Sequence, residues 1–211
     1  MDLISLPVSP FAARVRIAIY AKDLPIGVVP PPAGWRESRH FRDLSPTGRI
    51  PVLLDERGPI WESAVLLEYL EERFPHAQPL LPADVFDRAT ARLLVRHVDL
   101  YLMPPMVLLA QPRNDEGVAR RAVEELLSGV AMLDGLLNGA GYAVGDQLTI
   151  ADCALAPALF ALGVTAERLG MDLIEPGSAV DAYARLSRRD PHVGRVIGEM
   201  EQGLRLLVRV D

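Results

Sequence analysis

Prolines constrain the fold of this chain more than any other residue type, because they are concentrated at one end. Twelve of the 18 prolines fall within the first 82 of 211 residues. Proline lacks a backbone N–H and fixes its own φ angle, so short strands and turns tolerate this density and long helices do not. The sequence therefore predicts a first part built from short elements and a second part that can form long helices.

Residues 1–75 are predicted to form a small α+β domain. Short apolar runs bounded by proline and glycine predict strands, and apolar residues at helical spacing predict helices. A tight Asp-Glu-Arg-Gly turn between two apolar runs indicates an antiparallel hairpin. The predicted strands are 3–8, 26–29, 50–54 and 58–61, and the predicted helices are 11–22 and 62–74, with one helical turn around 35–41.

Residues 76–84 contain two prolines without a periodic pattern and are predicted to be a linker to an all-α bundle, residues 85–211. Amphipathic stripes mark its helices. The segment 149–162 is apolar on all sides and is predicted to be the core helix, opened by a capping box of Thr149 and Asp152. The predicted helices are 85–102 (ended by Met-Pro-Pro-Met), 116–137, 149–162, 178–188 and 191–207. We expect a ligand cleft between the two domains.

The composition narrows the classes of partner and the cellular location. Residues 1–80 carry 9 basic and 10 acidic side chains and residues 81–211 carry 13 and 18, so neither part favours a nucleic acid partner. The single cysteine, Cys153, excludes an internal disulfide and fits a reducing compartment. The N-terminus lacks the pattern of a signal peptide, and no stretch approaches the roughly 20 uninterrupted apolar residues that span a bilayer. We therefore expect a cytoplasmic protein that does not enter the membrane.

Pro51 lies inside a predicted strand, where proline requires an edge, a bulge, a turn or a cis peptide bond. A cis bond after Ile50 would leave the backbone groups of Ile50 free to pair with an extended, peptide-like ligand. The alternative is an edge proline that binds nothing.

Two predicted helix starts carry polar residues that suit an anionic ligand. Glu62 and Ser63 open one helix, whose N-terminus can hold a carboxylate while Glu62 holds an ammonium group. Ser9 opens another, where a hydroxyl and the helix dipole can stabilise an anion such as a thiolate. In each case the serine can also be a simple N-cap.

The spacing of SPFAARVRIA, SPTGRIPVL, ESAVLLEYL and LTIADCALAP resembles the cytosolic glutathione transferase superfamily across essentially the whole chain. The first segment is most similar to the classes with Ser or Cys at this point (zeta, theta, omega and bacterial forms). The resemblance implies a thioredoxin-like N-terminal domain that binds glutathione as co-substrate, a helical C-terminal domain, a homodimer and no metal.

The resemblance also implies roles for the matching residues. Ser9 would be the catalytic residue that donates a hydrogen bond to the glutathione thiolate. Ile50, ahead of a cis Pro51, would pair with the cysteinyl part, and Glu62 and Ser63 would hold the γ-glutamyl end. A basic or amide side chain from the loop before the hairpin would meet the glycyl carboxylate, and the nearest equivalents are Arg49, His40 and Arg39. The implied glutathione-binding residues are Phe11, His40, Arg49, Ile50, Pro51, Glu62 and Ser63.

Three departures from the family pattern affect these expectations. Ser9 has no neighbouring Ser or Cys, which disfavours zeta-type isomerase chemistry. Ser45-Pro46 stands in place of the usual Asn-Pro. The proline-rich loop 30–36 is expected to have its own geometry.

The second substrate would meet the end of the helix that begins at Val85. Polar and flexible apolar side chains there can line an adaptable pocket. The candidates are His97, Tyr101, Met103 and Met106. Two of these assignments have alternatives: His97 can be a packed histidine, and Met-Pro-Pro-Met can be a plain helix-breaking turn. Cys153 is expected to be an inert core residue.

The leading functional hypothesis is a detoxifying glutathione transferase that conjugates the thiolate to a small, mostly apolar electrophile, with peroxidase or isomerase activity as a secondary reaction. A second hypothesis is a non-catalytic regulatory protein with the same fold, similar to the stringent-starvation-type relatives that bind RNA polymerase. The presence of Ser9, Ile50-Pro51 and Glu62-Ser63 argues against it. Thiol exchange of the omega type ranks third, because it requires a cysteine at the position of Ser9.

Overall fold

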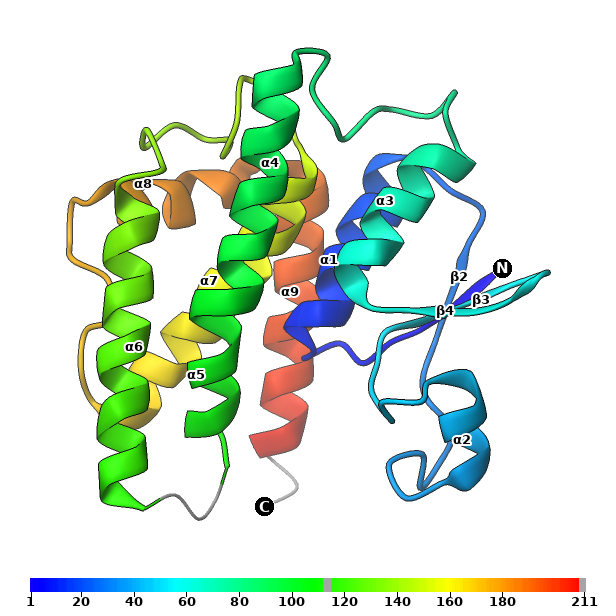
Figure 1. The fold of residues 1–211 in the computed structure, drawn as a ribbon, viewed down its shortest axis with the longest axis horizontal. Coiled ribbons are helices and arrows are strands. Elements are labelled where there is room, and N and C mark those ends of the chain that lie inside the picture. Colours follow the sequence, from blue (N-terminus) through cyan, green and yellow to red (C-terminus); the bar gives the residue numbers. More distant parts are fainter. Residues whose placement is uncertain (112–114, 209–211) are drawn as a thin grey trace. The chain divides into compact units, whose positions relative to one another are not determined.

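The computed structural model describes residues 1–111 and 115–208, which divide into two compact units. The first unit contains Met1–Leu80 and Arg195–Asp211, and the second contains Leu81–Gly194. The first unit holds a four-stranded sheet, and the second is helical where the structure describes it. The predicted division into an α+β part and an all-α part is therefore confirmed (Figure 1).

The first unit alternates short strands and helices. Its elements up to Leu80 are β1 (Asp2–Ile4), α1 (Pro10–Ala21), β2 (Gly27–Val29), α2 (Arg39–Leu44), β3 (Val52–Asp55), β4 (Gly58–Trp61) and α3 (Ser63–Arg73). The strand order is β2-β1-β3-β4, with β1 parallel to β2 and antiparallel to β3, and β3 antiparallel to β4. The predicted hairpin is the β3–β4 pair.

The two faces of the sheet are covered by different helices. Ile4 and Val52 are paired across β1 and β3 and pack with Phe41 of α2 in one buried cluster. Successive strand residues point to opposite faces, so the neighbouring pair Leu3 and Leu53, also fully buried, faces the other side. Figure 1 shows α1 and α3 on one side of the sheet and α2 on the other.

The first strand is shorter than predicted. The sequence pattern predicts a strand over 3–8, whereas β1 ends at Ile4. Pro7 has no N–H for a strand ladder, and the carbonyls of Leu6 and Pro7 instead accept hydrogen bonds from the Arg16 guanidinium at 3.0 and 2.8 Å. The Arg16 side chain therefore holds residues 5–8 as a loop, where the sequence pattern predicts that the strand continues.

Lys22 joins α1 to α3 through a buried ion pair. Its Nζ lies 2.7 Å from Oε1 of Glu71 and donates to the carbonyl of Gln78 at 2.8 Å. The other carboxylate oxygen of Glu71 accepts the N–H of Leu80 at 3.1 Å. Lys22 is 4% exposed, so its charge is compensated inside the protein. These contacts fix the chain that leaves α3.

Helix α9 (Pro191–Val208) begins in the second unit and ends in the first. The sequence assigns residues 191–207 to the helical bundle, but the part from Arg195 onward groups with the first unit. The Glu199 carboxylate there lies 3.2 Å from Nε of Arg16 and accepts the Tyr20 hydroxyl at 3.1 Å. These contacts to α1 hold the end of α9, and a helical periodicity does not reveal them.

The second unit consists of helices in its described residues. They are α4 (Val85–His97), a π turn η1 (Val98–Leu102), α5 (Met103–Leu109), α6 (Glu116–Asp134), α7 (Ile150–Leu169), α8 (Ala179–Leu186) and a 3₁₀ turn η2 (Ser187–Arg189). The predicted helix 85–102 corresponds to α4 and η1 and ends at Leu102 as predicted, but Met-Pro-Pro-Met is not a turn, because it forms the start of α5. Pro104 and Pro105 lie in its first turn, where a missing N–H breaks no helical bond.

Helix α7 is the predicted core helix, and it extends to Leu169. It is long and apolar enough to cross a membrane by length and composition alone, yet 61% of its most apolar window is buried inside the structure. It opens with the predicted capping box of Thr149 and Asp152. The Asp152 carboxylate accepts four hydrogen bonds, from the N–H groups of Ala143 and Thr149 and from the hydroxyls of Thr149 and Tyr183.

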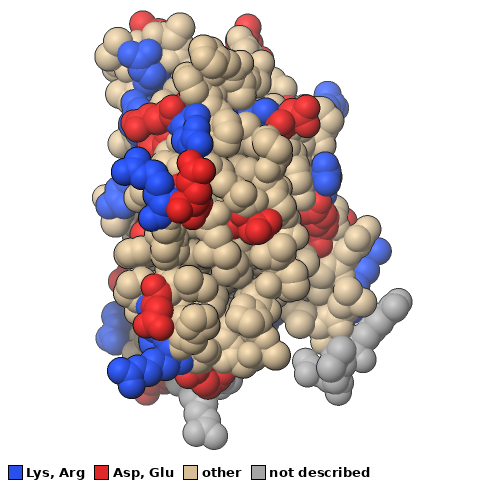
Figure 2. Space-filling model, turned by 90° about the vertical axis from the view of Figure 1, so that its right-hand side faces the viewer, with Lys and Arg blue, Asp and Glu red and all other residues tan. Residues whose placement is uncertain are grey.

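The surface carries acidic and basic side chains side by side. On the face shown in Figure 2, Lys and Arg side chains lie next to Asp and Glu side chains, and the described residues form no area of one sign on that face. Exposed pairs one helical turn apart, such as Arg120 with Glu124 on α6, fit this arrangement. Such pairs contribute at most about 0.5 kcal/mol each.

The Asp152 carboxyl makes stability depend on pH. Burial raises its pKa from 3.8 to about 6, although its four hydrogen bonds act in the opposite direction. Between these two values the folded protein holds a proton that the unfolded chain has released, so stability falls as pH rises through this window, by about 3 kcal/mol in all. We expect the unfolding free energy of the wild type, relative to Asp152→Asn, to fall by that amount between about pH 4 and about pH 7. Urea unfolding at several pH values measures it, and a constant or rising difference would contradict the assignment.

Candidate functional site

A small hollow in the first unit collects residues from three parts of the chain. It has a volume of about 60 Å³. Its walls come from the start of α1, the turn before β3 and the junction of β4 with α3. The lining residues are Phe11, Thr47, Arg49, Ile50, Pro51, Trp61, Glu62 and Ser63. Six of the residues predicted to bind a ligand are thus brought together, whereas Thr47 and Trp61 were not predicted.

The turn before β3 is built around the fully buried Ser45. Its hydroxyl donates to the carbonyl of Arg49 at 2.8 Å and accepts the N–H of the same residue at 3.2 Å. The carbonyl of Ser45 also accepts the N–H of Gly48 at 2.7 Å, and Gly48 has φ +63°, which suits glycine. In the sequence, Ser45 stands out only as a departure from the family pattern. The Ser-Pro-Thr-Gly sequence is the turn signal that could have identified it.

The peptide bond between Ile50 and Pro51 is cis, as predicted. The strand register of β3 starts at Val52, so Ile50 lies before the paired residues of the sheet. Ile50 lines the hollow at this point.

The start of α3 presents a polar pair. Glu62 is exposed and has φ 69°, an unusual value for a residue with a side chain, and its side chain makes no cap hydrogen bond to α3. Backbone strain of this kind costs roughly 1–3 kcal/mol and is often found at functional sites. Ser63 is buried beside it, at a helix end that carries partial positive charge. A carboxylate and a helix N-terminus therefore lie next to each other at the hollow.

Ser9 is the N-cap of α1, which is one of the two roles expected for it. Its Oγ accepts the N–H of Ala12 at 3.2 Å. A hydroxyl has two acceptor lone pairs and one donor, so this bond does not consume the O–H. Ser9 is half-buried and is not among the residues that line the hollow, although Phe11, two residues further along the same helix, is.

Arg14 connects the starts of α1 and α3 and was not identified from the sequence. It is fully buried, its Nη1 lies 3.5 Å from Oγ of Ser63, and its guanidinium lies 5.0 Å from the centre of the Phe11 ring. Phe11 and Arg14 are three residues apart, the spacing at which helical side chains meet. That spacing is the signal that could have pointed to this contact.

The three basic residues proposed for the glycyl carboxylate do not all lie at the hollow. Arg49 is exposed and lines the hollow. His40 is 88% exposed, lies 3.7 Å from an Asp43 carboxylate oxygen on the same helix, and does not line the hollow. Arg39 is exposed on α2 and does not line it either.

The four residues predicted for a second-substrate pocket lie in different surroundings. His97 is buried, its Nε2 lies 2.8 Å from the carbonyl of Gly129, and burial lowers its pKa. Met103 and Met106 are each 4% exposed, and Tyr101 is 47% exposed. A hollow of about 370 Å³ in the second unit is lined by α6 and the segment before α8 and includes none of the four.

The described residues contain no group of three His, Cys, Asp or Glu side chains that could hold a metal ion. Cys153 is buried in α7, where it packs in the core.

The turn at Ser45 gives a test of how the hollow is built. Ser45→Ala leaves the N–H and carbonyl of Arg49 without their partner, so we expect a loss of about 1–3 kcal/mol in unfolding free energy. Ser128→Ala, at an exposed serine on α6, is the control and should change stability by less than about 0.5 kcal/mol. Denaturant unfolding compares the two variants, and equal midpoints would show that the Ser45 bonds do not hold the turn.

Comparison with known proteins gives consistent matches. Models of the glutathione S-transferase N-terminal and C-terminal domains match residues 3–79 and 116–186. Maleylacetoacetate isomerase of Pseudomonas aeruginosa is 33% identical over 188 residues, 83% of this chain and 82% of that protein. The stringent starvation protein A homolog of Coxiella burnetii is 31% identical over 164 residues, 77% of this chain and 76% of that protein.

A solved structure agrees with these sequence matches. Rice GST1 in complex with glutathione superimposes with a TM-score of 0.80 at 27% identity, covering 99% of this chain and 96% of that one. The small mixed sheet with its helices is therefore the thioredoxin-like domain of this fold, followed by a mostly helical part. Fold, domain order and sequence agree, and the chain belongs to the cytosolic glutathione transferase superfamily.

Proposed function

We propose that this protein is a glutathione transferase that joins the sulfur of glutathione to a small, mostly apolar electrophile. One observation carries the proposal: residues from the start of α1, the turn before β3 and the start of α3 line one hollow in the first unit. The glutathione complex of the rice relative supports the choice of ligand.

Each end of the tripeptide has a matching group at the hollow. The α-ammonium of the γ-glutamyl residue pairs with the Glu62 carboxylate, and its carboxylate meets Ser63 at the start of α3. The backbone of Ile50 pairs with the cysteinyl residue as one strand pairs with another. Arg49 is the basic side chain for the glycyl carboxylate, because of the three candidates it is the one that lines the hollow.

Ser9 acts on the sulfur in this proposal. Its N-cap bond uses an acceptor lone pair, so the O–H can donate to the thiolate, and the start of α1 adds partial positive charge. One such donor is worth about 3 kcal/mol when it acts on the reacting anion. The thiol proton leaves to solvent, the thiolate attacks the electrophilic carbon, a C–S bond forms, and the leaving group departs with its electron pair.

The helical domain supplies the electrophile's binding wall in this proposal. Tyr101 is the exposed member of the predicted set and is therefore the member that can contact a substrate. The similarity to a maleylacetoacetate isomerase favours isomerisation as the second reaction to assay.

The similarity to a stringent starvation protein A homolog keeps a regulatory function as the second candidate. Calorimetry with glutathione separates the two candidates. Binding below millimolar concentration supports the transferase, and the absence of binding at millimolar glutathione would favour the regulatory protein. A panel of electrophiles then identifies the substrate class.

Ser9→Ala tests the mechanism. We expect glutathione affinity to change by less than about threefold and turnover to fall by about 100-fold, because one donor to the thiolate is lost. Ser178→Ala is the matched control, because it removes an N-cap bond of the same kind outside the first unit: the N–H of Asp181 on α8 donates to Oγ of Ser178. Steady-state kinetics of both variants measure the effect, and undiminished turnover in Ser9→Ala would remove Ser9 from the mechanism.

We also propose that the protein is a cytoplasmic homodimer. Large apolar side chains stay exposed on α4, including Val85, Phe86 and Leu93, at 70%, 78% and 52%. Covering them stabilises an assembly through the apolar area removed from water. Light scattering should give about twice the chain mass of 23.1 kDa, and the single-chain mass would contradict a dimer.

A further inference from the structure

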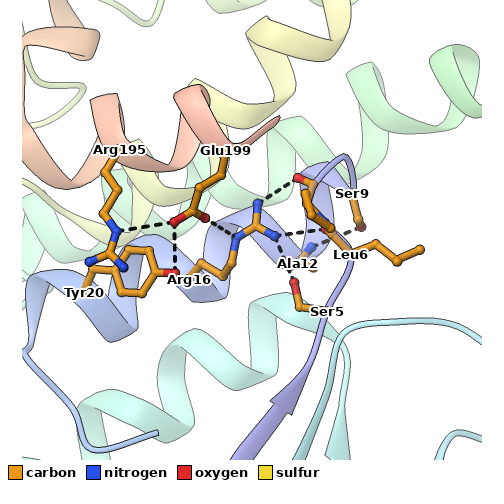
Figure 3. A network of polar contacts seen from close by, with 9 residues as sticks. Ser5, Leu6, Ser9, Ala12, Arg16, Tyr20, Arg195 and Glu199 are labelled. Atoms are coloured by element: carbon orange, nitrogen blue, oxygen red, sulfur yellow. Dashed lines mark hydrogen bonds and ion pairs between the residues drawn. The ribbon is translucent and has the colours of Figure 1, made fainter. Parts of the chain in front are cut away.

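The loop that carries Ser9 is held by the end of α9. This loop runs from the end of β1 at Ile4 to the start of α1 at Pro10. Figure 3 shows Arg16 reaching from α1 to this loop, with Glu199 on its other side. Nothing in the reaction proposed above assigns a role to these contacts.

One carbonyl joins Arg16 to Ser9. The carbonyl of Leu6 accepts the N–H of Ser9 at 3.1 Å and Nη1 of Arg16 at 3.0 Å. The guanidinium also donates to the carbonyl of Pro7 at 2.8 Å and to the hydroxyl of Ser5 at 3.0 Å. A planar guanidinium with fixed donors orients several acceptors at once. The position of Arg16 therefore sets the path of the loop up to Ser9.

Glu199 fixes Arg16. The guanidinium is 2% exposed, and a buried charge of this kind requires a counter-charge. Nε of Arg16 lies 3.2 Å from Oε2 of Glu199, an ion pair whose N–H direction does not meet hydrogen-bond geometry. The other carboxylate oxygen accepts the Tyr20 hydroxyl at 3.1 Å and Nε of Arg195 at 3.3 Å. The guanidinium of Arg195 also lies 3.6 Å from the centre of the Tyr20 ring, so the carboxylate has one defined position.

Gly203 gives a second, independent contact between α9 and the loop. A β-carbon built at this glycine would lie 2.9 Å from Cβ of Pro7 and 2.9 Å from Cγ1 of Val8. Real β-carbons do not approach other atoms this closely, so glycine is needed for the helix to touch the loop. One turn before Gly203, the same helix carries Glu199.

We propose that Glu199, acting through Arg16, is a positioning residue for the Ser9 hydroxyl, and that Gly203 allows α9 to close on the same loop. The proposal rests on the proposed function, because the positioned hydroxyl acts on the glutathione sulfur. It extends the catalytic apparatus to a helix that does not line the hollow.

Two matched pairs of variants test the proposal. Glu199→Gln removes the counter-charge of Arg16, and Glu201→Gln removes a half-buried partner of the exposed Arg205 on the same helix. Gly203→Ala adds a methyl group against the loop, whereas at Gly198 an added β-carbon would have no neighbouring atom within 4 Å outside its own helix backbone. Each pair changes α9 in the same chemical way, and one member of each pair touches the loop or its arginine.

The first readout is amide hydrogen exchange at Ser9, whose N–H is bonded to Leu6. We expect exchange about tenfold faster in Glu199→Gln and Gly203→Ala and unchanged in Glu201→Gln and Gly198→Ala. Equal exchange in all four variants would overturn the proposal. This readout needs no glutathione, so it decides the structural part even if the proposed function fails.

The second readout is the ultraviolet absorption of the bound thiolate as a function of pH. We expect the midpoint of the thiolate titration to rise by about one pH unit in Glu199→Gln and Gly203→Ala, so that tenfold less thiolate is present at low pH. Glutathione affinity should change by less than about threefold. A purely structural role would lower affinity and thiolate together. If the wild type binds no glutathione, the proposed function is refuted. If the wild type and Glu199→Gln have the same titration midpoint, the positioning role is refuted. If Glu199→Gln does not fold, the glycine pair decides.

Discussion

Burial of the Arg16 guanidinium is the constraint on which the arrangement of the first unit depends. A charge that is 2% exposed is tolerated only where acceptors and a counter-charge surround it. Leu6, Pro7 and Ser5 supply the acceptors, so the chain after β1 turns around the arginine and leaves the sheet at Ile4. Glu199 supplies the counter-charge, so the end of α9 packs with α1. One buried charge thus fixes the length of a strand, the path of a loop and the place of a distant helix.

The site is made from the ends of elements. Ser9 and Ser63 stand at the starts of α1 and α3, Arg14 joins the two starts, and Ile50 stands just before the first paired residue of β3. Helix starts and strand ends offer backbone groups that regular structure leaves unpaired, so they can bind a ligand without breaking the fold. Glu62, with its unusual φ, belongs to the same pattern, because it stands between β4 and α3 and lines the hollow.

Local patterns were sufficient for most of the fold, and contacts distant in sequence account for two of the differences. The β3–β4 hairpin and the capping box of α7 depend on residues a few positions apart, and both were predicted. The early end of β1 and the grouping of α9 with the first unit depend on Arg16 and Glu199, 183 positions apart in the sequence. Met-Pro-Pro-Met follows the predicted helix end at Leu102, but the pattern alone does not show that the same prolines open α5, where the first turn tolerates them. Residues of the hollow were predicted from the family resemblance, whereas Ser45 and Arg14, which contact other residues of the chain, were not predicted.

The buried Lys22 has a consequence for the chemistry of the whole molecule. It is the single lysine of the sequence, and its ammonium is enclosed by Glu71 and Gln78. The folded protein therefore shields its lysine from acylating reagents. Acylation of Lys22 will therefore report that the contact between α1 and α3 has opened.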